Sequence, residues 1–380
     1  MRYQWRMIKD ITDHEFIVFG NEHYNPLGIV RSLGERGIKP IGVIIKNKKP
    51  IVSKSKYLKK VFLVASVEEG YRFILRVYGK EAEKPFILAS DDTICSYLDT
   101  HLRELDNFIV YNAGEQGRIT QFMDKEFLLK TARKSGFRTP LEYEMNDDIV
   151  FGNISYPVIT KTNDSLKFGW KNYEKICNTK DELQKVINSR EGNKLIVQSY
   201  IKKKNELCLD GVAINGGKDV FVALASTYTY KIEDSYSFAF KVKNFESKPL
   251  QERLTKILSE IGFEGIFSAE FIIEENGKLV FLEINFRHST WGYAATCLGM
   301  NLVTIWAYGM LNGKFPENIK KNIPLNYRAM VELPDFRYRV LGRKMSLLRW
   351  IKELKKTDCL FYYNKNDPKP FWSAVIHSII

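Results

Sequence analysis

The stretch SAEFIIEENGKLVFLEINFRHST, residues 268–290, contains two apolar segments separated by Asn276–Gly277. Asn-Gly is a dipeptide that tight hairpin turns favour, so the stretch predicts a pair of antiparallel strands. Glu283 and Asn285 are two residues apart and project from the same face of their strand. The register about the turn places Glu270 approximately opposite Glu283, so three oxygen-bearing side chains converge on one patch.

Two carboxylates and an amide on a rigid sheet are hard oxygen ligands, which Mg²⁺ takes when it also binds nucleotide phosphates. Arg287 continues the alternation on the same face, where a guanidinium could stabilise a phosphate or an acyl-phosphate. The alternative is a half-exposed strand with its polar residues outward, which would carry lysine as readily as acids. The residue types and their spacing favour the metal site.

The sequence around this hairpin, from residue 125 onward, predicts an α+β region with antiparallel sheets. A second hairpin is expected at 211–227, because an Asn-Gly-Gly turn divides its apolar run. Segment 293–310 is expected to be helical, and the basic, aromatic residues beyond about 315 form a C-terminal extension. The remaining expected elements are strands at 157–161 and 195–201 and helices at 126–136, 181–189 and 250–261.

The first hundred residues instead alternate between short apolar strands and amphipathic helices, which predicts a parallel sheet covered by helices. The expected strands are 15–20, 39–45, 61–64 and 86–92, and the expected helices are 26–37 and 67–78. Ligands of such sheets gather beyond the carboxyl ends of the strands, so 20–25 and 90–92 are expected rim positions.

Four rim or near-rim residues are candidates for substrate contact: Asn21, His23, Asp91 and His288. Three of them have a plainer alternative interpretation. Asp91 and its neighbour Asp92 could cap the helix that follows them. His23 could be a loop residue that faces water, and His288 could be a structural histidine. None of the five histidines pairs with a cysteine at zinc-binding spacing.

Composition narrows the class of protein. The 380 residues are enough for two or three domains, and 44% hydrophobic with 27% charged residues is globular composition. No uncharged apolar run reaches 18 residues, so we expect no membrane span. The first 16 residues carry charges and no apolar core, so we expect no signal peptide. Five cysteines without a CxxC pair predict free thiols and a cytoplasmic location.

The net charge of +13 raises the alternative of nucleic-acid binding. No helix-turn-helix, zinc-finger or RNP-like segment accompanies the charge, and it suits an anionic small substrate at least as well. We therefore expect no nucleic-acid partner. The densest basic patch consists of Lys46, Lys48, Lys49, Lys54, Lys56, Lys59 and Lys60.

The order of several short motifs resembles the ATP-grasp superfamily, and in particular the D-aspartate ligase and carbamoyl phosphate synthetase-like carboxylate–amine ligases. These motifs are MDK (123–125), PVITK (157–161), LIVQSYI (195–201), NELCLDG (205–211), SAEF (268–271) and LEINFR (282–287). The resemblance implies α/β plus α+β architecture: a parallel-sheet pre-ATP-grasp domain at 1–115 and an ATP-grasp domain at 116–315. A lid at about 150–200 belongs to the latter, and 316–380 is an extension packed on the core.

The resemblance also implies roles for individual residues. Lys125 and Lys161 match the lysines that bind ATP phosphates, and Glu206 matches the acid on the ribose hydroxyls. The segment whose backbone contacts adenine in the family corresponds here to Gln198, Ser199, Tyr200 and Ile201. The ligands of Mg²⁺ (or Mn²⁺) match Glu270, Glu283 and Asn285, and Arg287 matches the arginine near the transferred phosphate.

This sequence departs from the family pattern in two places. The phosphate-covering loop is usually rich in glycine and serine, whereas residues 162–172 contain one glycine. Many members carry an arginine two residues before the first acidic metal ligand, and here that position is Ser268. The candidates for the missing positive charge are Lys231, Lys241 and Lys243.

The expected function is an ATP-dependent carboxylate–amine ligase, such as an amino-acid ligase, that forms an amide through an acyl-phosphate and releases ADP and phosphate. The expected partners are a small carboxylate, with an acidic amino acid as first choice, and a small amine. The sequence leaves open whether the chain forms a homodimer. The alternatives are other ATP-grasp chemistry, either carboxylation or thioester formation, and a non-catalytic nucleotide-binding protein.

Overall fold

The computed structural model describes residues 11–143, 154–162, 175–189, 195–232 and 236–379. The chain divides into two compact units, each of which is discontinuous in sequence. Unit 1 comprises Met1–Thr120, Leu207–Ser268 and Asn285–Ile380, and unit 2 comprises Gln121–Glu206 and Ala269–Ile284.

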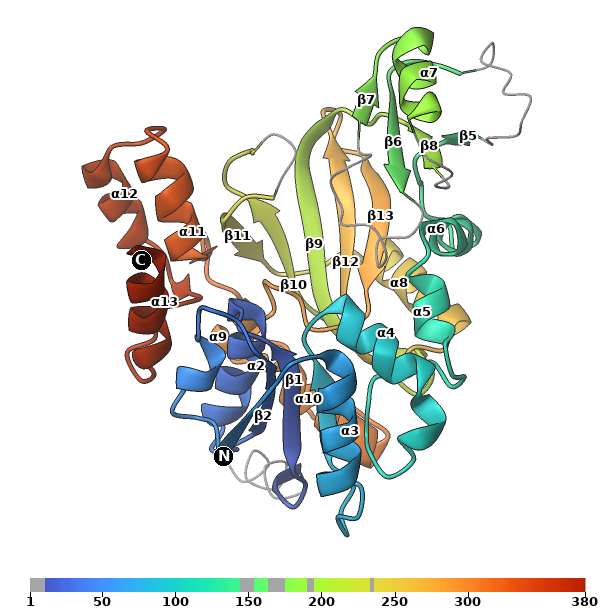
Figure 1. Ribbon diagram of the computed structural model, residues 1–380. Coiled ribbons are helices and arrows are strands. Elements are labelled where there is room, and N and C mark those ends of the chain that lie inside the picture. The colour runs from blue at the N-terminus through green and yellow to red at the C-terminus, as the bar shows by residue number, and fades with distance from the viewer. Residues whose placement is uncertain (1–10, 144–153, 163–174, 190–194, 233–235, 380) are drawn as a thin grey trace. The chain divides into compact units, whose positions relative to one another are not determined.

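Unit 1 begins with the predicted parallel sheet, in the order β3-β2-β1-β4. Figure 1 labels its two central strands, β1 and β2. The strands are β1 (Phe16–Asn21), β2 (Ile41–Ile45), β3 (Lys60–Val64) and β4 (Phe86–Ala89). The helices that follow strands are α2 (Tyr24–Gly34), α3 (Val67–Tyr78) and α4 (Asp92–Thr100), with short 3₁₀ turns at Val52–Lys54 and Leu102–Glu104. Every strand and helix expected in this region is confirmed, within a few residues at each end.

A second sheet has seven strands, in the order β13-β12-β9-β10-β11-β14-β15. Its residues 203–206 and 269–284 belong to unit 2 and the others to unit 1. Its strands are β9 (Lys203–Ile214), β10 (Asp219–Tyr228), β11 (Ala239–Lys243), β12 (Gly265–Glu274), β13 (Leu279–Asn285), β14 (Arg328–Met330) and β15 (Cys359–Leu360). The β9–β10 hairpin turns through Asn215, Gly216 and Gly217, all at positive φ, as the sequence predicts. Helix α8 (Lys248–Ile261) leads into β12.

The residues beyond 315 are more than an extension of the chain. β14 pairs antiparallel with β11, and β15 pairs parallel with β14, so this segment adds two strands to the sheet. Between and after them lie α11 (Glu332–Phe336), a π-helical turn at Arg337–Leu341, α12 (Leu347–Leu354) and α13 (Lys369–Ile379). The segment predicted as one helix at 293–310 is two, α9 (Tyr293–Cys297) and α10 (Leu302–Asn312), because Gly299 at φ +81° separates them.

Unit 2 contains a small antiparallel sheet in the order β5-β8-β6-β7. Its strands are β5 (Glu142–Tyr143), β6 (Val158–Thr162), β7 (Lys175–Cys177) and β8 (Leu195–Ser199). Helix α7 (Lys180–Asn188) packs on it through Leu183 and Val186, and α5 (Arg118–Phe122) and α6 (Lys125–Lys134) precede it. The phosphate-covering loop expected at 162–172 lies outside the described residues, apart from the backbone of Thr162.

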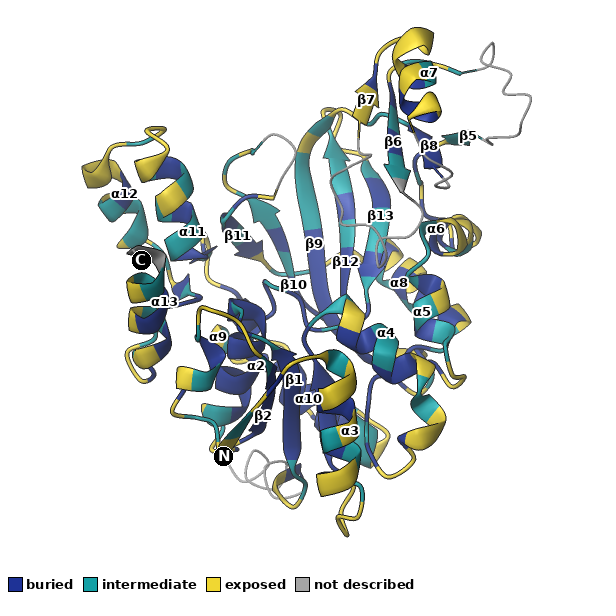
Figure 2. Cartoon of the chain, in the orientation of Figure 1, coloured by how far each residue is buried: buried dark blue, intermediate teal, exposed yellow. Residues whose placement is uncertain are grey.

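The apolar core follows the strands: β1 is buried over five consecutive residues, whereas α3 exposes one face (Figure 2). No helix in the described parts of the chain has both the length and the apolar character that crossing a bilayer requires.

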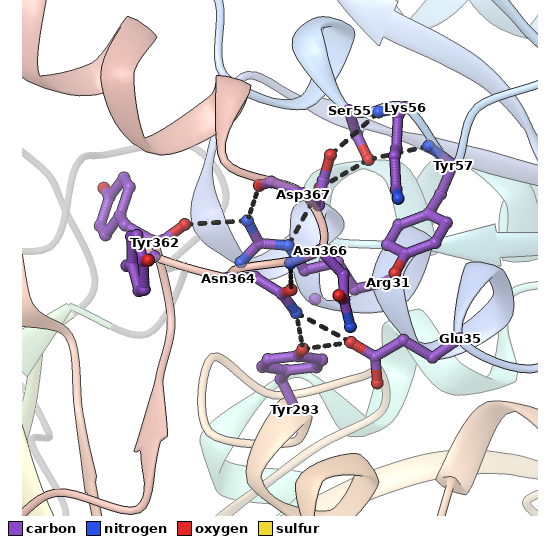
Figure 3. A network of polar contacts seen from close by, with 12 residues as sticks. Arg31, Glu35, Ser55, Lys56, Tyr57, Tyr293, Tyr362, Asn364, Asn366 and Asp367 are labelled. Atoms are coloured by element: carbon purple, nitrogen blue, oxygen red, sulfur yellow. Dashed lines mark hydrogen bonds and ion pairs between the residues drawn. The ribbon is translucent and has the colours of Figure 1, made fainter.

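A buried ion pair fastens the C-terminal segment to α2 within unit 1 (Figure 3). Arg31 is completely buried, and its Nε donates to Oδ2 of Asp367 at 3.1 Å. The other guanidinium nitrogens donate to the carbonyls of Phe361, Tyr362 and Asp367 at 2.8–3.0 Å. Asp367 in turn accepts from the hydroxyl of Ser55 at 2.8 Å. The guanidinium thus makes four hydrogen bonds within the protein, so the packing depends on both ionic partners.

We expect Asp367→Asn to lower the free energy of unfolding by about 3–5 kcal/mol, because it leaves the buried Arg31 without its counter-charge. The measurement is urea denaturation followed by tryptophan fluorescence. Glu15→Gln, which breaks the partly exposed pair of Glu15 and Lys59, is the control and should cost at most about 1 kcal/mol. Equal losses in the two variants would contradict the role of the Arg31–Asp367 pair.

Candidate functional site

The segment that leaves β13 docks on the start of α4 within unit 1. Arg287 forms a two-point ion pair with Asp92, with Nε to Oδ1 at 2.9 Å and Nη2 to Oδ2 at 2.8 Å. The same Nη2 donates to Oδ1 of Asn285 at 3.2 Å. The prediction that Arg287 lies on the face of Asn285 is therefore confirmed. Asp92 fixes the orientation of the guanidinium through both of its oxygens.

Asn25, at the start of α2, joins this segment to the carboxyl end of β4. Its side-chain nitrogen donates to the carbonyl of Ser90 at 2.7 Å and to that of His288 at 2.9 Å. Its Oδ1 contacts Nδ1 of His288 at 2.9 Å, which assigns the proton to that nitrogen. Asn25 and His288 are both buried. One side chain thus connects residues 90 and 288, which are 198 residues apart in sequence.

The predicted rim residues gather at the same place. Asn21 donates to Oδ2 of Asp91 at 3.4 Å, and Oδ1 of Asp91 accepts from the backbone of Ile94 and caps α4. His23 caps α2 by accepting from the backbone of Asn25 at 3.2 Å. The capping alternative for Asp91 is confirmed, and His23 is a half-buried cap and not a water-facing loop residue. We call Asn21, His23, Asn25, Asp91, Asp92, Arg287 and His288 the rim cluster.

Burial controls the protonation of the rim cluster. It lowers the pKa of His23 to about 4, with a further contribution from the charge of Arg287. Burial likewise lowers the pKa of His288 to about 4, so both imidazoles are neutral at pH 7. Burial raises the pKa of Asp91. The hydrogen bonds and packing of His288 support its interpretation as a structural histidine.

Asp210 of β9 is a buried carboxylate that the sequence analysis did not single out. It accepts a hydrogen bond from Ser289 at 2.5 Å, and Cys208 approaches its other oxygen at 3.9 Å. Burial raises the pKa of Asp210 to about 6. An acid inside the apolar run LCLDGVAI is the signal that could have identified it, because a buried carboxylate requires partners.

Ser268 occupies the position where the family pattern has an arginine, and it is fully buried. Its hydroxyl lies 2.9 Å from the sulfur of Cys208, so the site carries a network of small polar groups in place of a cation. Cys208 is opposite Ser226, which is opposite Val242, so these side chains share one face of the sheet. Lys241 and Lys243 flank Val242 and therefore project from the other face.

The two lysines expected to bind phosphate lie in unit 2. Lys125 is the first residue of α6, directly after the capping Asp124. Lys161 lies on β6, an inner strand of the four-stranded sheet, and is opposite Ile196 of the neighbouring strand β8. Both lysines are half-buried. Their role in phosphate binding stays a prediction.

The expected adenine hinge is the end of β8 and the residues after it. Gln198 is buried and donates to Oε1 of Glu142 at 3.2 Å. The backbone N–H groups of Ser199 and Tyr200 donate to the carbonyls of Leu141 and Pro157 at 2.8 and 3.0 Å. An adenine ring would therefore be recognised by other backbone groups of this segment, such as those of Ile201.

The remaining predicted residues lie on long strands. Glu206 forms an ion pair with Lys203 on β9. Glu283 and Asn285 are half-buried on either side of the buried Ile284, which confirms that they share a face of β13.

Glu270 is half-buried on β12, which neighbours β13 as the hairpin predicts. Its position directly opposite Glu283 stays a prediction. In the parts of the chain that the structure describes, no three His, Cys, Asp or Glu side chains form a metal-binding group. The proposed set contains two carboxylates and an amide.

Comparison with known proteins identifies the fold. No family model and no curated protein matches the sequence. Among solved structures, the chain is similar to L-amino acid ligase from Bacillus licheniformis, with 12% identity and a TM-score of 0.57 over 79% of this chain and 74% of that one. It is also similar to pyruvate carboxylase from Rhizobium etli, with 15% identity and a TM-score of 0.63 over 83% of this chain. It spans only 32% of the length of that carboxylase.

A third similar structure is the biotin carboxylase domain of 2-oxoglutarate carboxylase from Hydrogenobacter thermophilus, in complex with MgADP and bicarbonate. The identity is 18% and the TM-score 0.61, over 83% of this chain and 73% of that one. These neighbours are ATP-grasp proteins, so the chain has the ATP-grasp fold, as predicted.

Asp210 makes stability depend on pH in a defined direction. In the native protein the Asp210 carboxyl keeps its proton up to about pH 6. In an unfolded chain the same carboxyl loses its proton near pH 3.8. Relative to Asp210→Asn, the free energy of unfolding should therefore fall as pH rises from about 4 to about 6 and then level off. The full change corresponds to roughly 3 kcal/mol.

Urea denaturation of both proteins across this pH range measures the difference. Asp219→Asn, which removes an exposed carboxylate from the same hairpin, controls for the loss of one negative charge. A difference between the chain and Asp210→Asn that does not change with pH would contradict the assignment.

Proposed function

We propose that this chain with the ATP-grasp fold is an ATP-dependent ligase that joins a carboxylate to an amine through an acyl-phosphate. The observation that carries the proposal is the hydrogen bond from Arg287 to Asn285 at 3.2 Å, beside the rim cluster. It brings a guanidinium and a predicted metal ligand to the carboxyl edge of a parallel sheet, where ligands of such sheets gather. The guanidinium would stabilise the oxygens of a carboxylate or a phosphoryl group, and the metal ligand would hold the metal ion that accompanies the nucleotide.

The residues present suit a magnesium-bound nucleotide. Glu270, Glu283 and Asn285 offer the oxygen donors that Mg²⁺ or Mn²⁺ prefers, and half-burial leaves them accessible. When bound, the metal neutralises charge on the phosphates. Lys125 and Lys161 would bind phosphate oxygens, Gln198–Ile201 the adenine, and Glu206 the ribose hydroxyls. The MgADP in the similar biotin carboxylase domain supports this choice of ligand.

The proposed reaction needs no nucleophilic side chain. An oxygen of the substrate carboxylate attacks the γ-phosphorus of ATP, and the bond to ADP breaks to leave an acyl-phosphate. The amine nitrogen then attacks the acyl carbon, phosphate departs with the electron pair, and the proton of the amine passes to solvent or phosphate. Catalysis of this kind rests on positioning and on stabilising charge.

Arg287 would stabilise the transferred phosphoryl group, and Asp92 would hold the guanidinium in place. Asn21 and Asp91 are the polar groups of the rim cluster that a substrate amine or carboxylate could contact. His23 and His288 are neutral at pH 7, so they would act there through hydrogen bonding and packing and not as cations. The positive net charge favours an anionic substrate, with an acidic amino acid as the first choice.

Carboxylation is the second candidate function, because two of the three similar structures are of carboxylases or their domains. It would begin with the same phosphoryl transfer, with bicarbonate in place of the organic carboxylate. The two candidates differ in the substrate that stimulates ADP release: bicarbonate in one case, and a carboxylic acid together with an amine in the other. A non-catalytic nucleotide-binding protein would release no ADP with either.

The variant that tests the proposal is Glu283→Gln, assayed by ADP release across a panel of carboxylates and amines. The amide is a poorer magnesium ligand of similar shape, so we expect a loss on the order of 100-fold or more, equivalent to several kcal/mol. Glu274→Gln is the matched control, since it makes the same change on the same hairpin at a residue paired with Arg138. Activity of Glu283→Gln equal to that of this control would contradict the metal assignment.

A further inference from the structure

A pocket of about 490 Å³ opens in unit 1 where the C-terminal helices cover one face of the large sheet. Trp350 of α12 packs with Ala239 of β11 and Met330 of β14 in one apolar cluster, and Figure 1 shows α11 near β11. The volume lies in the range of about 300–1,000 Å³ that small-molecule sites occupy. Among the lining residues that the structure describes, one is acidic, Glu353, and six are basic: Lys231, Lys241, Arg328, Arg339, Lys344 and Arg349.

Two of these cations face each other directly across neighbouring strands. Lys241 of β11 is the cross-strand partner of Arg328 of β14, so both side chains leave the same face of the sheet. Like charges in this position destabilise a sheet. Both side chains are half-buried beneath the helices, unlike the freely solvated lysines of a typical charge run. An anion bound between the two charges would offset this repulsion.

One buried acid connects the elements that surround the pocket. Asp335 is fully buried and accepts from Tyr230, Arg339 and Trp350 at 2.6–3.1 Å, which fixes α11, α12 and the end of β10 relative to one another. Arg339 also donates to Glu353 at 2.7 Å, so the single acid of the lining is already paired. Arg339 is thus paired with two acids, and among the lining residues that the structure describes the remaining basic side chains still outnumber the acidic ones.

Aromatic rings form another part of the lining. The rings of Tyr230 and Tyr338 are nearly parallel, with centroids 6.2 Å apart. The ammonium of Lys344 lies 3.5 Å from the centroid of Tyr338, so the ring holds a cation at the pocket. The site thus offers both cations and flat apolar surface. This combination suits a ligand with an anionic group attached to an apolar organic moiety.

The pocket is separate from the rim cluster. Lys241 projects from the face opposite to Val242, and Val242 shares its face with Cys208 and the neighbouring Ser268. Asp210, two residues along β9 from Cys208, lies on that face too and binds Ser289, which follows the rim-cluster residue His288. The sheet therefore stands between the basic pocket and the buried polar network beside the rim cluster.

We propose that this pocket binds a small ligand with a phosphate or a comparable group of two or more negative charges. Several ammonium and guanidinium donors around one volume match such a group, and Arg328 offers the planar fork that recognises phosphate oxygens. The group could belong to a compound free in solution or to a lipid headgroup. The second source is relevant because Leu341 and Leu348 are 64% and 75% exposed on the covering helices.

The test compares two double variants of the full chain that lose the same charge. Lys241→Gln/Lys344→Gln removes two cations of the pocket. Lys243→Gln/Lys352→Gln removes one exposed lysine from β11 and one from α12, neither of which lines the pocket. Titration calorimetry with inorganic pyrophosphate, in buffer without magnesium, measures the free-solution source. Co-sedimentation with vesicles of phosphatidylcholine and phosphatidic acid measures the headgroup source.

We expect the pocket variant to bind pyrophosphate at least about tenfold more weakly than both the control variant and the parent chain, from the loss of charge-assisted contacts. Without ligand, Lys241→Gln alone should raise the melting temperature, because it relieves the repulsion from Arg328. A defect of the pocket variant confined to vesicles assigns the headgroup source. Equal binding by the two double variants in both assays, or no binding by the parent chain in either, overturns the proposal. The outcome is independent of ADP release, so it does not depend on the proposed ligase function.

Discussion

The ion pair of Arg287 with Asp92 determines where the candidate site is. Asp92 begins α4 at the carboxyl edge of the parallel sheet, and Arg287 follows the strand that carries Glu283 and Asn285. Asn25 reinforces the junction by bonding Ser90 and His288. Together these contacts attach the motif LEINFR to the rim. Without them, the arginine and the rim residues would have no fixed relation, and neither a carboxylate nor a phosphoryl group would meet a defined set of charges.

Buried charges then fasten the C-terminal segment to this framework. Arg31 with Asp367 holds it to α2, and Asp335 with Arg339 ties its own helices together. Breaking such a pair is costly because the remaining partner stays buried and charged. The same segment adds two strands to the large sheet and covers the basic pocket. A part of the chain that sequence periodicity left featureless therefore stabilises the fold and lines the pocket for which we propose an anionic ligand.

The contrast between sequence and structure has physical reasons. The strands and helices of the first hundred residues were predictable, because each is a local apolar run with a helix cap or a turn. The C-terminal strands were not, because they have three and two residues. β14 pairs with β11, far away in sequence, and β15 pairs with β14. Asn285 and Arg287 were predictable from alternation within one strand. The face of Lys241 was not, because it depends on register across several strands.

The central claim is that a carboxylate is activated by phosphoryl transfer from ATP. Chromatographic analysis of nucleotide products, with hydroxylamine present to trap an acyl-phosphate as hydroxamate, tests it most directly. The account predicts ADP and phosphate, together with hydroxamate formation by the carboxylate that stimulates ATP turnover. AMP and pyrophosphate as products, or ATP turnover stimulated by a carboxylate that yields no hydroxamate, would contradict it.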